Sequence, residues 1–201
     1  MKFLEIAAGR KRGLNWDAVR DVADPAKGVE KYDLTDLPMK GVLDNTYNGV
    51  YSEHFIEHLT KDEGINYFKE MYRIMTPGGI IRSIWPPMEF VEWLRQVNDL
   101  SNHGWVQHYY NFYVVKHNFA PKDTRHMRIQ DQCAEGIMHQ NGEHKHIWRK
   151  TELIECLIEL GYTNVKEYKY QISGLGAFNN IDTPGEVRAF HSAVVEASKP
   201  W

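Results

Sequence analysis

The sequence has few cysteines, no long apolar run and no large excess of either charge. Its 201 residues include only two cysteines, Cys133 and Cys156, which form neither a C-x-x-C pair nor a metal-ligand spacing. No apolar stretch approaches the length that crosses a bilayer, and the first residues do not resemble a signal peptide. We therefore expect a cytoplasmic protein that has no disulfides and is not inserted in a membrane.

The charge balance argues against a highly charged partner. There are 24 Lys and Arg residues against 27 Asp and Glu residues, a formal net charge of -3. Such a balance gives no broad basic footprint for nucleic acid or for an anionic membrane surface. Hydrophobic residues make up 42% of the chain and charged residues 25%, which is typical of a single soluble domain. We expect one domain over residues 1–201, with a small molecule as its partner.

The first 87 residues alternate between strand and helix patterns. Short apolar runs predict strands over residues 2–6, 48–51 and 80–85, the last closed by two prolines. Residues 61–75 predict an amphipathic helix. Its start is a capping box, Thr60 to Glu63, and its expected core stripe is formed by Ile65, Phe68, Tyr72 and Met75. Pro77-Gly78-Gly79 is expected to end this helix.

The second half of the chain contains an irregular segment and then regular elements. Residues 88–150 are rich in aromatic residues and histidines without clean periodicity, so we expect an insertion or cap over the sheet. Thr151 predicts the N-cap of a helix, with Gly161 just past its end. The core face expected for this helix consists of Leu153, Ile154, Leu157 and Ile158. Residues 164–172 and 191–197 predict two final strands that form an antiparallel hairpin at the sheet edge. The whole pattern predicts an α/β fold with a mostly parallel sheet.

The stretch His54-Phe55-Ile56-Glu57-His58 has the spelling H-x-x-E-H, which some zinc peptidases use on one helix. Here a strand is predicted directly before His54 and a new capping box at Thr60. Because these elements split the stretch, the two histidines are not expected on one helix. A zinc hydrolase is therefore the least favoured interpretation, and we expect no metal.

Several short motifs, taken in order, resemble those of class I S-adenosylmethionine-dependent methyltransferases, and more narrowly the methyltransferase type 11-like proteins. Residues 3–9, Phe-Leu-Glu-Ile-Ala-Ala-Gly, occupy the place of the family's first glycine motif. Residues 52–59, Ser-Glu-His-Phe-Ile-Glu-His-Leu, match its fourth-strand exit. Residues 75–82, Met-Thr-Pro-Gly-Gly-Ile-Ile-Arg, match its following Pro-Gly-Gly segment. The resemblance covers about the first 90 residues well and residues 143–199 loosely.

The resemblance implies a Rossmann-like sheet with helices on both faces and S-adenosylmethionine as cofactor. Glu5 would engage the cofactor's ammonium group, Asp17 the ribose hydroxyls, and Asp33 and Leu34 the adenine. The remaining cofactor contacts that it implies are Ala7, Ala8, Gly9, Ser52, Glu53 and His54. The residues themselves leave a simpler alternative open in each case, such as a turn-forming Asp33 or a solvated Asp17.

The implied reaction is methyl transfer to a hydroxyl or carboxyl group of a small molecule, such as a saccharide or another secondary metabolite. A hydroxyl acceptor benefits from a general base, and histidine suits this task because its unperturbed pKa is about 6.5. His54 is the first candidate base and His144 the second.

One departure from the family pattern favours a different class of function. The family's first motif has two glycines where this chain has Ala7 and Gly9. The added methyl of Ala7 lies where the cofactor normally contacts backbone, which favours a non-catalytic binding or scaffold protein as the alternative. The many aromatic residues outside the sheet motifs are compatible with a homodimer interface.

Overall fold

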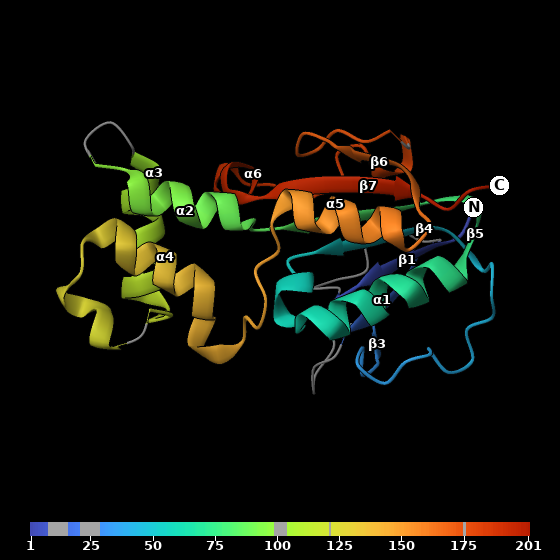
Figure 1. Ribbon diagram of the computed structural model, residues 1–201, viewed down its shortest axis with the longest axis horizontal. Helices are drawn as coiled ribbons and strands as arrows, with labels where there is room; N and C mark the ends of the chain where they lie inside the picture. The colour runs from blue at the N-terminus through green and yellow to red at the C-terminus, as the bar shows by residue number, and fades with distance from the viewer. Residues whose placement is uncertain (8–15, 21–28, 99–103, 121, 175) are drawn as a thin grey trace.

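A seven-stranded sheet forms the centre of the computed structural model, which describes residues 1–7, 16–20, 29–98, 104–120, 122–174 and 176–201 (Figure 1). The strand order is β3-β2-β1-β4-β5-β7-β6. All neighbouring strands are parallel except β7, which runs antiparallel to both β5 and β6. The predicted α/β fold with an antiparallel edge hairpin is confirmed. The strands are β1 (Phe3–Ile6), β2 (Trp16–Arg20), β3 (Glu30–Lys31), β4 (Tyr47–Glu53), β5 (Met75–Trp85), β6 (Thr163–Glu167) and β7 (Ala193–Ser198).

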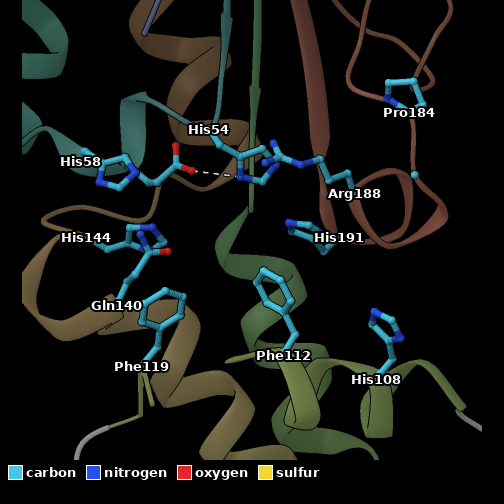
Figure 2. A pocket seen from close by; sticks show the side chains of 12 residues that line it. His54, His58, His108, Phe112, Phe119, Gln140, His144, Pro184, Arg188 and His191 are labelled. Carbon is cyan, nitrogen blue, oxygen red and sulfur yellow. Dashed lines mark hydrogen bonds and ion pairs between the residues drawn. The ribbon is translucent and has the colours of Figure 1, made fainter. Parts of the chain in front are cut away.

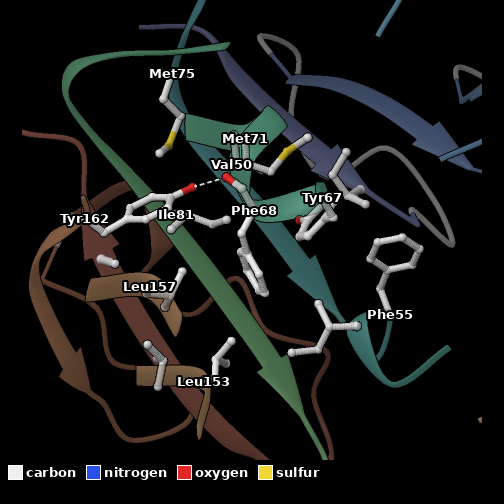
Figure 3. Close-up of a cluster of buried hydrophobic side chains, with 14 of the residues drawn as sticks. Val50, Phe55, Tyr67, Phe68, Met71, Met75, Ile81, Leu153, Leu157 and Tyr162 are labelled. Atoms are coloured by element: carbon white, nitrogen blue, oxygen red, sulfur yellow. Dashed lines mark hydrogen bonds between the residues drawn. The ribbon is translucent and has the colours of Figure 1, made fainter. Parts of the chain in front are cut away.

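The helix α1 (Lys61–Ile74) begins where its capping box predicts. The Thr60 side chain accepts a hydrogen bond from the Glu63 N–H at 3.3 Å, and the Glu63 carboxylate accepts one from the Thr60 N–H at 2.8 Å. The expected core stripe is only partly right. Phe68 and Met75 are buried as predicted, although Met75 is already the first residue of β5, and Ile65 and Tyr72 are only partly buried. The buried apolar residues of the helix are Tyr67, Phe68, Met71 and Ile74. Figure 3 shows the first three of them in the core.

The Pro77-Gly78-Gly79 turn lies inside strand β5 and does not end the helix. The helix ends at Ile74, and β5 begins at Met75 directly after it. The pairing with β4 shifts register between Tyr47 and Gly49, opposite this segment. Gly78 has φ +75, a left-handed conformation that glycine adopts without a steric penalty. The segment is therefore an irregularity in a long strand.

The helix α5 (Lys150–Glu159) packs with α1 on one face of the sheet. Leu153 and Leu157 are buried as predicted, whereas Ile158 is 57% exposed. The predicted N-cap is two residues late, because Arg149 occupies that position and donates its N–H to the Glu152 carboxylate. Tyr162, just past the helix, donates its hydroxyl to the Phe68 carbonyl at 2.8 Å and joins the two helices (Figure 3).

The opposite face of the sheet is covered by the connection from β6 to β7. This connection contains the 3₁₀-helix η5 (Gly176–Phe178) and the helix α6 (Glu186–His191), so both final strands are shorter than predicted. Phe178 packs with Phe3, Trp16 and Tyr51, all buried. The connection thus supplies the apolar cover of this face.

A buried ion-pair network fastens the same connection to the sheet. Arg82 on β5 is fully buried. Its guanidinium lies 2.5 Å from Asp182 in the connection and 2.7 Å from Glu196 on β7. Because both carboxylates are also buried, Arg82 is what compensates their charge.

A helical lobe, formed by the described residues 88–98, 104–120 and 122–142, lies beyond the carboxyl ends of β4 and β5 (Figure 1). It has its own apolar core, which includes Val91, Leu94, Val106 and Ile137. The sequence indicated a cap here but not its helices, because no apolar stripe repeats cleanly. None of the helices in the described ranges is long and apolar enough to cross a membrane. The elements of the lobe are α2 (Met88–Gln96), α3 (Gly104–Tyr109), the π-helix η2 (Tyr110–Lys116), the 3₁₀-helix η3 (Lys122–His126), α4 (Ile129–His139) and the 3₁₀-helix η4 (Gln140–Gly142).

The Arg82 network generates a stability prediction. Arg82→Met leaves two buried carboxylates without their cation, so we expect the free energy of unfolding to fall by about 3 to 5 kcal/mol. Arg95→Met is the control, since it breaks a more exposed pair with Glu135 and is expected to cost less than about 1 kcal/mol. Urea unfolding at neutral pH measures both. Equal losses in the two variants would contradict the role given to Arg82.

Candidate active site

The exit of β4 separates the two histidines of the H-x-x-E-H stretch, as predicted. His54 follows the strand directly, has φ +52 and donates its N–H to the Ile84 carbonyl at 2.8 Å. Glu57 and His58 lie on the 3₁₀-helix η1 (Ile56–His58). His54 and His58 are therefore not two ligands one turn apart on a helix, and the peptidase-type zinc pair is absent.

A cavity of about 480 Å³ opens beside this exit, at the carboxyl ends of the central strands (Figure 2). Its walls come from the β4 exit, η1, the helical lobe, the segment before α5, and α6. In open α/β sheets, ligands bind at this edge. The cavity brings together both predicted bases, His54 and His144. Its wall includes His54, Glu57, His58, Phe112, His144 and Arg188.

His54 lies between an acidic and a hydroxyl partner. Its Nδ1 is 3.1 Å from a Glu57 carboxylate oxygen, and its Nε2 is 3.0 Å from the Ser192 hydroxyl oxygen. An ionised carboxylate only accepts, so Nδ1 carries the proton and Nε2 presents a lone pair. The ring of His191 lies 4.9 Å from that of His54. This arrangement orients His54 with its basic nitrogen away from Glu57.

The titration of the buried site groups follows from their surroundings. Burial by itself raises the pKa of the Glu57 carboxyl, but the hydrogen bond from His54, together with the electrostatic effect of the His54, His144 and His58 rings, holds this pKa below its ordinary value. Burial lowers the pKa of His144. Glu57 is therefore ionised and His144 neutral at neutral pH.

The residues expected at the first strand are only partly within the described ranges. Glu5 is a buried carboxylate, 1% exposed, near the end of β1. Ala7 follows with φ +55, so the chain turns through a left-handed conformation although glycine is absent here. Ala8 and Gly9 lie outside the described residues.

The residues expected near the adenine follow β3. The Asp33 carboxylate accepts hydrogen bonds from the N–H and the hydroxyl of Thr35, at 2.9 and 2.7 Å. This is the turn-forming geometry that was the alternative for this residue. Leu34 is buried in the core beside it.

Asp17 does not lie where the ribose contact was expected. It is the second residue of β2, three residues before the strand ends. Its carboxylate accepts the Tyr47 hydroxyl at 2.7 Å and lies 2.8 Å from the Lys2 ammonium. Lys2 directly precedes β1 and Tyr47 is the first residue of β4, so Asp17 lies toward the amino ends of these strands, opposite the edge where the cavity opens. Arg20 is the last residue of the strand, so Asp17 lies well before its carboxyl end.

The Glu53 side chain binds the β6–β7 connection. Its carboxylate accepts hydrogen bonds from the Tyr170 hydroxyl at 2.5 Å and from the Thr183 hydroxyl at 2.6 Å. The Arg188 guanidinium lies 3.4 Å away. Ser52 is buried and its hydroxyl lies 3.3 Å from that of Ser83 on β5. These side chains position the β4 exit.

Sequence reasoning did not identify Arg188 and Ser192 as site residues. Both follow Gly185 in the β6–β7 connection. Arg188 lies just before the strand that was predicted over residues 191–197, and Ser192 lies within it. A glycine and a charged residue just before the final strand give only a weak indication that a binding site lies there. Their place beside His54 depends on the antiparallel β7, which brings this connection back to the carboxyl end of β5.

No protein-family model and no curated protein sequence matches the chain. Solved structures do. A SAM-dependent methyltransferase from Archaeoglobus fulgidus aligns with a TM-score of 0.57 and 17% identity, over 98% of this chain and 86% of that one. A SAM-dependent methyltransferase from Thermotoga maritima aligns with a TM-score of 0.51 and 16% identity, over 98% and 81%. The chain therefore has the class I methyltransferase fold.

The Glu53 contacts generate a prediction about acid stability. Burial by itself raises the pKa of Glu53, but the hydrogen bonds from Thr183 and Tyr170 and the Arg188 charge lower it from 4.5 to about 2. A lowered folded-state pKa adds stability that is present above pH 4.5 and is lost as the pH falls through 2. We expect this contribution to reach about 3 kcal/mol.

Glu53→Gln removes the ionisable group and checks this expectation. The difference in unfolding free energy between the native chain and the variant should shrink between pH 5 and pH 2. Urea unfolding at several pH values measures it. A difference that stays constant over this range would contradict the expectation.

Proposed function

We propose that this chain is an S-adenosylmethionine-dependent methyltransferase that acts on a hydroxyl or carboxyl group of a small molecule, such as a saccharide or another secondary metabolite. The observation that carries the proposal is the oriented His54 in a cavity at the carboxyl ends of the strands. The strand order, which is that of the class I methyltransferase fold, supports it.

The described residues at this edge suit the cofactor in their chemistry. Glu5 supplies a buried carboxylate for the cofactor's ammonium group, and the left-handed turn at Ala7 directs the chain away from the strand end. Leu34 would offer its backbone N–H to the adenine. When bound, S-adenosylmethionine supplies a methyl group on a sulfonium, which is a strong leaving group. The chain's own task is therefore chiefly to position the acceptor.

His54 is the proposed general base for a hydroxyl acceptor. Glu57 fixes the proton on Nδ1, so Nε2 is free to take the acceptor's proton once Ser192 gives up its hydrogen bond. Glu57 also stabilises the imidazolium that results. A carboxylate acceptor, already ionised at neutral pH, needs no such base.

The cavity supports a small acceptor. A volume of about 480 Å³ lies within the range of small-molecule sites. Phe112 and Phe119 give apolar surface for a ring, and Arg188 gives a cation that can bind a carboxylate. These groups come from different elements around one opening (Figure 2).

Cofactor binding is the first test. We expect calorimetric titration with S-adenosylmethionine and S-adenosylhomocysteine to give micromolar affinity. Glu5→Gln should lower the affinity for S-adenosylmethionine by at least about 10-fold, because it removes the charge that would face the ammonium group. Asp17→Asn, at the opposite edge of the sheet, is the control and should change affinity less than twofold. Absence of binding by the folded protein would overturn the proposal and favour a scaffold function.

The base has a separate test. A panel of monosaccharides, hydroxy acids and aromatic carboxylic acids is screened for S-adenosylhomocysteine release. With hydroxyl acceptors, His54→Gln should lower turnover by about 10² to 10⁴, the usual contribution of a general base. Ser192→Ala should lower it less, and His139→Ala, on the exposed end of α4, should leave it unchanged. Turnover of hydroxyl acceptors unaffected by His54→Gln would refute the role of this residue.

A further inference from the structure

Three side chains with metal-binding atoms converge in one wall of the cavity. Glu57 and His58 come from η1, and His144 comes from the segment before α5. One ligand atom from each lies within 4.8 Å of the other two. The rings of His58 and His144 are 4.8 Å apart and nearly perpendicular, at 82° (Figure 2).

Backbone hydrogen bonds hold this convergence in place. The Glu57 carbonyl accepts the N–H groups of Lys145 and His146, at 2.9 and 3.3 Å. The residue after His144 is thus tied to the residue before His58. The three side chains meet because backbone hydrogen bonds join two chain segments, and not because exposed side chains happen to lie near one another.

The histidine His144 is oriented as metal-binding histidines usually are. Its Nδ1 donates to the Ile137 carbonyl, so the proton is fixed on that nitrogen. Nε2 therefore keeps its lone pair, and a backbone hydrogen bond of this kind fixes both tautomer and ring direction at metal sites.

The Glu57 carboxylate has one oxygen engaged and one without a partner. Oε1 binds His54, whereas buried Oε2 has no hydrogen-bond partner among the described residues. Glu57 is fully buried. An ionised oxygen in this position is costly unless a cation faces it. This observation is independent of the spacing of the three ligands and points to the same site.

We propose that Glu57, His58 and His144 bind one divalent transition-metal ion, with Zn²⁺ as the best match. Two imidazole nitrogens and one carboxylate oxygen are a donor set found at catalytic zinc sites, which keep a further position open. Ligand atoms about 2.1 Å from one ion lie about 3.4 Å apart, so binding draws atoms that are now within 4.8 Å of one another together by up to about 1.4 Å. His54 is not a ligand here; it positions Glu57 through Oε1.

The open position of the ion would face the cavity, because all three ligands line it. An acceptor with a hydroxyl or carboxylate oxygen could therefore bind the ion directly, and a bound hydroxyl loses its proton more readily. This use of the ion rests on the proposed methyltransferase function. Metal binding itself does not.

The test measures metal binding in the absence of S-adenosylmethionine, so its outcome is separate from the cofactor titration. Chelator-treated protein is titrated with Zn²⁺ by calorimetry, and with Co²⁺ while visible ligand-field bands are recorded. We expect one equivalent to bind. His58→Ala and His144→Ala should each lower the affinity for Zn²⁺ by at least about 100-fold. His54→Ala, which removes only a positioning contact, should lower it by about 10-fold.

The control is His139→Ala, since His139 is an exposed histidine of the same lobe and lies beside Glu135. It should keep the full stoichiometry and affinity. Circular dichroism establishes that each variant is folded. Absence of a stoichiometric ion in the folded native chain, or equal losses in His139→Ala and His144→Ala, would overturn the proposal.

Discussion

Glu57 is the residue on which the geometry of the cavity depends. Its carbonyl binds the two N–H groups after His144, and its carboxylate binds the imidazole of His54. The residue is fully buried, so its carbonyl and its Oε1 depend on these partners within the protein. The β4 exit, η1 and the segment before α5 are therefore held in one arrangement. A shift of any of the three would leave a buried charge or carbonyl unsatisfied.

The second face of the sheet is covered by a segment from the last third of the chain. The connection from β6 to β7 covers this face with Phe178 and with the carboxylate of Asp182, which pairs with Arg82. The same connection continues past Glu53 to α6. It therefore has two effects: it closes the core, and it carries Arg188 and Ser192 to the cavity. Stability and site geometry share one segment.

The elements that could be predicted are those defined by nearby residues. The capping box at Thr60 identified the start of α1, and short apolar runs identified β1, β4 and β5. The buried stripe of α1 was predicted only in part, with Tyr72 expected where Met71 is buried, because the direction in which a helix faces the sheet depends on packing. Asp17 was misassigned because the start of β2 is set by its pairing with β1, which leaves Asp17 opposite Leu4.

The sequence by itself determined the alternation of strands and helices and the break between His54 and His58. These features follow from backbone preferences over a few residues. Only the tertiary structure decided that His54 meets Ser192, 138 residues away, and that His144 meets Glu57. Sequence patterns over a few residues cannot predict such contacts, because the contacts depend on strand order and on where the long connections return to the sheet.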